Sequence, residues 1–402
     1  MAAARQQNLP KQFSFAAAAC GLKKSGLDLA AIVSEIPSVA AAMFTTNLVQ
    51  AAPVAVSKEH LRKNRTRMRA IVVNSGNANC ATGSAGRSAS LKTTREVAKQ
   101  LRCSAEQVLV CSTGVIGVPL KVDNVLRAAF GLIQSRRAAA RSFAGVTRAI
   151  MTTDTRPKWA FERIQIGGKP VRILGCAKGA GMIQPNMATM LAFVVTDAAV
   201  GYRELTLALR TAVAGTFNAI TIDGDTSTND TIAVLANGAS ETASLRPGSS
   251  GYAAFASALL KVCQKLALAI VADGEGAKRV IEIEVCGART VKDAESIART
   301  IANSPLVKTA FSGGDPNWGR ILAAAGRAGV PFDPARVRID LAGVRVCQSG
   351  LERSFNERAV HRNMLAKFVP VRMDLLAGSA SARIWTCDFT GDYVLINASY
   401  RT

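Results

Sequence analysis

The sequence predicts a mixed α/β protein built from two domains. A chain of 402 residues is long enough for two or three domains of ordinary size. Its composition, 49% hydrophobic and 19% charged, is typical of a well-packed globular protein, and with only 5% aromatic residues the core must consist of small and aliphatic side chains. Short apolar runs of strand length alternate with segments of helical period along the chain.

In the first half, residues 15–57 predict a meander of strands and turns, punctuated by glycine and proline. FTTNLV, from position 44, continues this pattern as a further strand, and AIVVN (70–74) predicts a strand that ends in a glycine- and asparagine-rich loop. Such a loop either presents backbone N–H groups to a ligand or serves as simple chain punctuation. The remaining predicted elements are a helix at Ser88–Leu101, a strand at Val108–Cys111 and one or two helices in 119–146.

In the second half, helices are predicted at 202–216, 252–271 and 291–302, and a further helix is predicted to begin at GGDPNWGR (313–320). Strands are predicted at 279–285, 336–347, 369–375 and 383–397, so that a C-terminal strand carries the last residues toward the site. The polar loop FNAITIDGDTSTNDT (217–231) lacks the ligand spacing of an EF-hand, which favours a supporting loop over a metal site.

Thr189 is the strongest candidate nucleophile. It follows the small residue Ala188 at the junction between a glycine-rich turn and an apolar run. Cleavage of the Ala188–Thr189 bond would place a hydroxyl and a free α-amine on one residue, and such an amine titrates near neutral pH and can act as the base for its own hydroxyl. Without cleavage, Thr189 is an ordinary β-branched residue opening a strand.

Several motifs in order along the chain resemble the glutamate N-acetyltransferase/ornithine acetyltransferase family of arginine biosynthesis. They include KGAGMIQPNMATMLAFVVTDA around Thr189, VVNSGNAN (72–79), STGVIG (112–117), ADGEGA (272–277), GGDPNWGR and the terminal NASYRT. The resemblance implies a self-cleaving fold with an N-terminal threonine nucleophile. It also implies an α fragment of residues 1–188 and a β fragment of residues 189–402, assembled as an α2β2 heterotetramer.

The same resemblance implies ping-pong transfer of an acetyl group from N2-acetylornithine to glutamate through acetyl-Thr189. Thr113 and Gly114 would form the oxyanion hole, since a Thr-Gly turn can aim a hydroxyl and an N–H at a developing negative oxygen. The implied substrate-binding residues are Thr152, Lys178, Thr189, Glu275, Asn397 and Thr402. No metal and no organic cofactor is expected, and use of acetyl-CoA as a second acetyl donor is left open.

Of the implied substrate-binding residues, Lys178 would supply the positive charge and Glu275 would face the side-chain amine of ornithine. The chain departs from the family pattern at Lys278, where a threonine is usual. The polar contacts beside Glu275 are therefore expected to differ from those of the family, whereas the role of Glu275 itself is kept.

The charge of the chain is strongly basic and unevenly distributed. The net charge is +22, and residues 1–188 hold 27 of the 50 basic residues but 8 of the 28 acidic ones. The densest patch, KEHLRKNRTRMR (58–69), has no interleaved aromatic residues and no nucleic-acid-binding motif around it, so a solvated helix or loop is favoured over a nucleic-acid interface.

Cysteine usage and hydropathy indicate a protein of the reducing cytoplasm. The nine cysteines occur singly with no CxxC pair, as reduced core residues do. The longest uncharged run, 36–57, is interrupted by prolines and polar residues, so no membrane span is expected, and the N-terminus lacks the features of a transit peptide.

Two alternatives to the acetyltransferase remain. An N-terminal-nucleophile amidase or aminopeptidase would share Thr189 and self-cleavage but pass the acyl group to water. A nucleic-acid-binding protein is supported by charge alone. A histidine-based catalytic triad is disfavoured, because the chain holds only His60 and His361, both expected at the surface.

Overall fold

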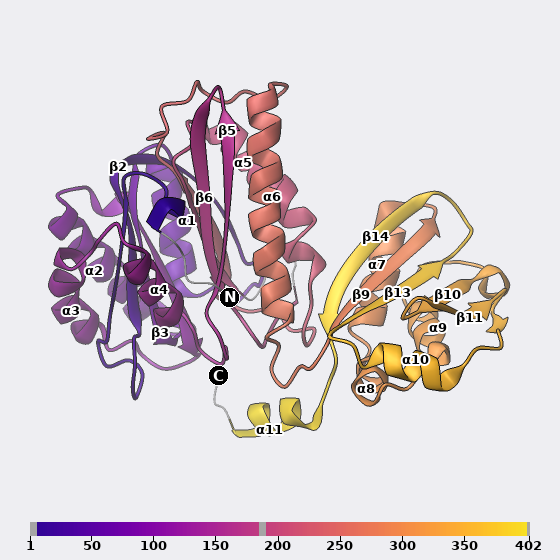
Figure 1. Ribbon diagram of the computed structural model, residues 1–402. Helices are drawn as coiled ribbons and strands as arrows, with labels where there is room; N and C mark the ends of the chain where they lie inside the picture. The colour runs from indigo at the N-terminus through magenta and orange to yellow at the C-terminus, as the bar shows by residue number, and fades with distance from the viewer. Residues whose placement is uncertain (1–5, 185–189, 400–402) are drawn as a thin grey trace.

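The computed structural model describes residues 6–184 and 190–399. Two lobes stand side by side, each organised around one β-sheet (Figure 1). The larger lobe comprises the chain up to about residue 278, and the smaller lobe comprises residues 280–387. The mixed α/β fold predicted from the sequence is therefore confirmed.

The larger lobe contains an eight-stranded sheet in the order β4-β3-β2-β8-β7-β6-β5, with β1 paired to the first part of β2. The pairs β3–β4 and β7–β8 are parallel and the others are antiparallel. The strands are β1 (Phe13–Ala18), β2 (Leu29–Phe44), β3 (Met68–Asn77), β4 (Val108–Val115), β5 (Lys158–Ile166), β6 (Lys169–Lys178), β7 (Leu191–Thr196) and β8 (Thr231–Ala236).

Helices cover both faces of this sheet, because its central strands are apolar on both sides. Along β7, Ala192 and Val194 face one core with α5 and α6, whereas Leu191 and Phe193 face another core that includes Phe143 of α4. The helices are α1 (Ala52–Asn64), α2 (Gly83–Leu101), α3 (Val122–Gln134), α4 (Ala140–Ala149), α5 (Tyr202–Ala214) and α6 (Ser250–Val271).

Helix α6 is long and apolar enough to cross a membrane by length and composition alone. In the structure it lies along β5 and β6, and Phe255, Leu259 and Leu266 of its inner face are buried in the core. Its hydrophobicity is therefore that of a helix packed on a sheet.

The smaller lobe contains a six-stranded sheet in the order β12-β11-β10-β13-β9-β14 with helices packed against it. Its strands are β9 (Val280–Ala288), β10 (Arg338–Leu341), β11 (Val344–Gln348), β12 (Leu351–Glu352), β13 (Phe368–Asp374) and β14 (Ala380–Cys387). Its helices are α7 (Val291–Ala302), α8 (Pro305–Gly313), α9 (Trp318–Gly326) and α10 (Glu357–Met364). A final helix, α11 (Gly391–Ser399), leaves this lobe and runs back below the larger one (Figure 1).

Several predictions from the sequence were wrong. The meander predicted at 15–57 ends earlier, because helix α1 begins at Ala52, and the strand predicted at 336–347 is two strands, β10 and β11, joined by a turn at 342–343.

The predicted C-terminal strand ends at Cys387, and the chain then forms helix α11. The FTTNLV strand ends at Phe44, because Asn47 and its neighbours form side-chain bonds to the local backbone that replace a strand ladder. His60 is buried, with 2% of its surface exposed, because it lies on the inner face of α1 where its Nδ1 is 2.8 Å from the Val108 carbonyl oxygen.

The predicted fragments 1–188 and 189–402 do not follow the division into lobes. Strands β1–β6 precede the predicted junction, whereas β7 and β8 follow it and lie in the middle of the same sheet. If the chain is cut there, the two fragments stay joined through the ladders between β6 and β7 and between β2 and β8.

Candidate active site

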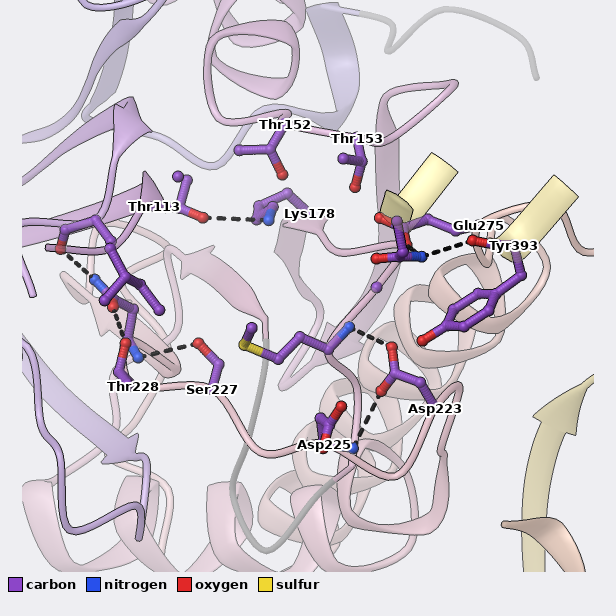
Figure 2. Close-up of a pocket in the computed structure, with 17 residues that line it drawn as sticks. Thr113, Thr152, Thr153, Lys178, Asp223, Asp225, Ser227, Thr228, Glu275 and Tyr393 are labelled. Atoms are coloured by element: carbon purple, nitrogen blue, oxygen red, sulfur yellow. Dashed lines mark hydrogen bonds between the residues drawn. The ribbon is translucent and has the colours of Figure 1, made fainter. Parts of the chain in front are cut away.

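A cavity of about 210 Å³ lies where the ends of several strands of the larger sheet meet the loop after α6 and helix α11 (Figure 2). Six of the residues that the sequence identified line this one cavity, although they are up to 284 positions apart in the chain: Thr113, Gly114, Thr152, Lys178, Glu275 and Asn397. Ala188, Thr189 and Thr402 lie outside the described residues.

Thr113 and Gly114 occupy the end of β4, beside the irregular end of its parallel partner β3. Gly114 has a φ of +132°, and a Cβ added to it would lie 2.4 Å from the backbone carbon of Gly76. No other residue fits this close approach of two backbones. The Thr113 hydroxyl faces the cavity and accepts a hydrogen bond of 3.2 Å from Lys178 Nζ (Figure 2).

Lys178 is the last residue of β6, with 8% of its surface exposed. Burial lowers the pKa of its amine, and the carboxylate of Asp154 opposes this more than any other neighbour. The pKa of Asp154 itself is lowered: burial alone would raise it, but Lys178, Lys158 and the Gly179 N–H together outweigh burial. Lys178 thus supplies a positive charge inside a partly closed cavity, where an anion is held more strongly than in water.

Glu275 supplies the opposite charge from the loop that follows α6. Its carboxylate accepts a hydrogen bond of 2.8 Å from Asn397 of α11, and its backbone N–H donates to the Ala180 carbonyl at 2.9 Å. The opposite chain segment passes so close that a Cβ at Gly181 would lie 2.5 Å from the Glu275 carboxylate. A side chain at position 181 would therefore push the Glu275 carboxylate out of its present position in the cavity.

Sequence reasoning did not identify every residue of the cavity. Thr153, Asp223, Ser227, Thr228 and Tyr393 also line it. Burial raises the pKa of Tyr393, with Asp223 adding to the effect, so its phenol stays a neutral hydrogen-bonding group. Ser227 and Thr228 belong to the polar loop 217–231, which the sequence analysis predicted to support the site without naming these two residues.

Asp223 holds the backbone that approaches the predicted cleavage junction. Its carboxylate accepts hydrogen bonds from the N–H groups of Met182 and Ile183, at 2.5 and 2.8 Å. A further bond of 2.7 Å runs from the Ile222 N–H to the Ile183 carbonyl. The loop before β8 thereby fixes the last described residues ahead of the junction.

Together, a Thr-Gly strand end, the buried ammonium of Lys178 and carboxylates that include Glu275, all lining a small cavity, define an α/β enzyme site for a small charged molecule. Comparison with known proteins gives the family. The ArgJ family model matches residues 14–402. The chain belongs to the ArgJ family and is an enzyme of arginine biosynthesis.

Curated relatives match over almost the whole chain. The "Arginine biosynthesis bifunctional protein ArgJ" of Desulfotalea psychrophila is 49% identical over 399 residues, covering 98% of this chain and 99% of the relative. The protein of the same name from Symbiobacterium thermophilum is 47% identical over 399 residues, covering 98% of each. Among solved structures, an arginine biosynthesis bifunctional protein ArgJ chain from Bacillus halodurans is 40% identical with a TM-score of 0.52; the match covers 53% of this chain and 100% of that one.

Proposed function

We propose that this enzyme transfers the acetyl group of N2-acetylornithine to glutamate through an acetyl ester on Thr189. The observation that carries the proposal is the convergence of Thr113, Gly114, Lys178 and Glu275 on one cavity. Acetylornithine and glutamate share an α-carboxylate and differ at the far end of the side chain. The cation Lys178 suits the shared α-carboxylate, and the carboxylate Glu275 suits the side-chain ammonium of the donor, acetylornithine. Family membership agrees with this substrate pair.

In the first half-reaction, Thr189 Oγ attacks the acetyl carbonyl carbon of the donor while the α-amine of Thr189 takes the hydroxyl proton. Thr113 and Gly114 stabilise the oxyanion of the tetrahedral intermediate, a contribution of about 3 kcal/mol per donor in other enzymes. The intermediate then expels ornithine, whose α-nitrogen receives the proton from the Thr189 amine. The acetyl group stays on the threonine as an ester.

In the second half-reaction, the neutral α-amine of glutamate attacks the ester carbonyl carbon. The α-amine of Thr189 takes a proton from the attacking nitrogen and returns it to Thr189 Oγ, which leaves as the free hydroxyl. The α-carboxylate of each substrate binds Lys178, and the side-chain ammonium of ornithine binds Glu275 with Asn397 beside it. Thr152 and Thr402 complete the binding set. These steps need a nucleophile, a base and oxyanion donors, and we include neither a metal nor an organic cofactor in the mechanism.

The mechanism requires a free α-amine on Thr189, so we also propose self-cleavage of the Ala188–Thr189 bond. Thr189 Oγ attacks the Ala188 carbonyl, the peptide becomes an ester, and water hydrolyses it. One comparison supports this: the whole of a solved chain of the family matches 53% of the present chain. Residues 189–402 likewise make up 53% of the present chain. We propose an α2β2 assembly in the cytoplasm, where nine free cysteines remain reduced.

The test is an assay of purified protein with acetylornithine and glutamate, with a Thr189→Ala variant as the control. Formation of acetylglutamate by the wild type, and a variant that stays one uncleaved chain without activity, are expected. Release of acetate without acetylglutamate would replace this proposal with the amidase alternative. A parallel assay with acetyl-CoA and glutamate decides whether the enzyme also uses that donor.

A further inference from the structure

A cluster of three charged side chains is buried behind the wall of the cavity. Lys158, at the start of β5, has 1% of its side chain exposed, and its Nζ contacts Asp154 Oδ1 at 2.6 Å and Asp273 Oδ2 at 2.5 Å. The two carboxylates are 0% and 3% exposed. Removing three charges from water is costly, and an apolar cluster of the same size often stabilises a protein as well. Stability alone is therefore a weak reason for burying these three charges.

Asp154 holds two segments of the cavity wall. Its Oδ2 accepts a hydrogen bond of 3.0 Å from the Thr152 N–H, and its Oδ1 accepts one of 2.6 Å from the N–H of Gly179, the residue after Lys178. One carboxylate therefore fixes both the loop that carries Thr152 and the end of the strand that carries Lys178.

Asp273 belongs to the loop that carries Glu275 and bonds to the loop at 152–155. It accepts a hydrogen bond of 3.1 Å from the Thr155 N–H and another from the Thr155 hydroxyl, and it lies two residues before Glu275. Through Lys158, the loop that carries Glu275 is joined to the loop at 152–155. The cluster thus links the positively and negatively charged walls of the cavity.

The cluster also controls the charge of Lys178. Burial lowers the pKa of this amine; Asp154, Asp230 and Glu275 oppose the effect, whereas Lys158 adds to it. Lys23, whose own pKa is lowered by burial, repels Lys178 as well. Among the groups that oppose burial, Asp154 raises the pKa of Lys178 the most.

We propose that Asp154, Lys158 and Asp273 form a positioning network that sets the distance between the two charged walls and so determines substrate affinity. Asp154 places Lys178 for the α-carboxylate, and Asp273 places Glu275 for the ornithine ammonium. The inference rests on the proposed acetyl transfer, because it uses the substrate contacts assigned there.

The experiment compares steady-state kinetics of Asp154→Asn and Asp273→Asn with those of wild type. Asp154→Asn is expected to raise KM for both substrates about 10-fold, with kcat changed less than about 3-fold, because ground-state contacts are lost. Asp273→Asn is expected to raise KM for acetylornithine about 10-fold and KM for glutamate less than about 3-fold.

A pH profile separates positioning from simple structural damage. Lys178 binds the carboxylate only while protonated, so KM rises as pH passes its pKa. Asp154→Asn removes the group that most raises this pKa, and its KM must therefore begin to rise at a lower pH than that of wild type.

Asp197→Asn is the matched control. Asp197 is likewise fully buried, pairs with Arg172 Nη1 at 3.1 Å and accepts backbone N–H bonds. It follows β7 and lies beside Arg172 near the start of β6, and a separation of six residues along β6 places Arg172 roughly 20 Å from Lys178. Its KM values and pH profile are expected to match those of wild type.

Unchanged KM values and pH profiles in both test variants, or equal increases in all three variants, would overturn the inference. If Asp273→Asn does not yield folded protein, Thr155→Val, which removes one hydroxyl donor, is measured against the same criterion. A wild-type enzyme without acetyl transfer would refute the proposed function, and this outcome is seen before any variant is compared.

Discussion

Replacing Gly114 by alanine tests whether the Thr-Gly turn is a rigid device for holding a hydrogen-bond donor in place. The new Cβ would lie 2.4 Å from the Gly76 carbon and 2.5 Å from the Asn77 nitrogen. Both are backbone atoms of β3 and cannot move as a flexible side chain would. The φ of +132° is also one that alanine rarely adopts.

The expected cost has two parts. Strain at positive φ contributes about 1–2 kcal/mol, and forcing the two strands apart contributes about 1–3 kcal/mol, so the free energy of unfolding should fall by about 2–5 kcal/mol. Because the Gly114 N–H moves with the strand, kcat should also fall by about 100-fold or more. Urea unfolding and acetyl-transfer kinetics measure the two effects.

Gly117→Ala is the control for strain without a clash. Gly117 also has a positive φ, +78°, but nothing lies within 4 Å of a Cβ at this position. It should lose only about 1–2 kcal/mol and keep its kcat. If Gly114→Ala is no less stable and no less active than Gly117→Ala, the structural reasoning about the turn is wrong.

Two further predictions concern charges near the lobe junction. Glu275→Gln keeps the bond to Asn397 but loses the charge, so KM for acetylornithine should rise about 10–100-fold while KM for glutamate does not rise; equal increases would contradict the assignment. Lys308 is fully buried, its Nζ contacts the Cys387 carbonyl, and burial lowers its pKa from 10.5, opposed by Cys387 and Asp388. The unfolded chain therefore keeps this proton to a higher pH than the folded protein does. As the pH rises toward 10.5, the stability of wild type should rise relative to Lys308→Met by at most about 1.4 kcal/mol per pH unit, and the same pH dependence of the unfolding free energy in both proteins would contradict this.

The sequence predicted most of the elements because their apolar periodicity and turn residues are local. The strand at 108–111 and the helices at 88–101 and 291–302 are examples that the structure contains. The C-terminal segment was predicted as part of a strand over 383–397, and the strand in fact ends at Cys387. As a helix, however, it places Tyr393 and Asn397, four residues apart, on the one cavity, which a strand would separate by about 13 Å.

The residues of the candidate site likewise divide into those that local motifs identify and those that only the three-dimensional structure brings together. Thr113, Lys178 and Glu275 could be located from motifs, but the link from Lys158 to Asp273 joins residues 115 positions apart and leaves no local pattern. The burial of His60 was missed for a related reason: surrounding arginines suggested a surface, whereas the inner face of α1 is set by its contact with β4.

The central claim is that an acetyl group passes through Thr189, and mass spectrometry of the protein after incubation with acetylornithine alone tests it most directly. We predict two fragments, with the one that begins at Thr189 gaining one acetyl group and losing it again when glutamate is added. An intact chain in active protein, or an active enzyme whose Thr189 fragment never gains the acetyl group, would contradict the account.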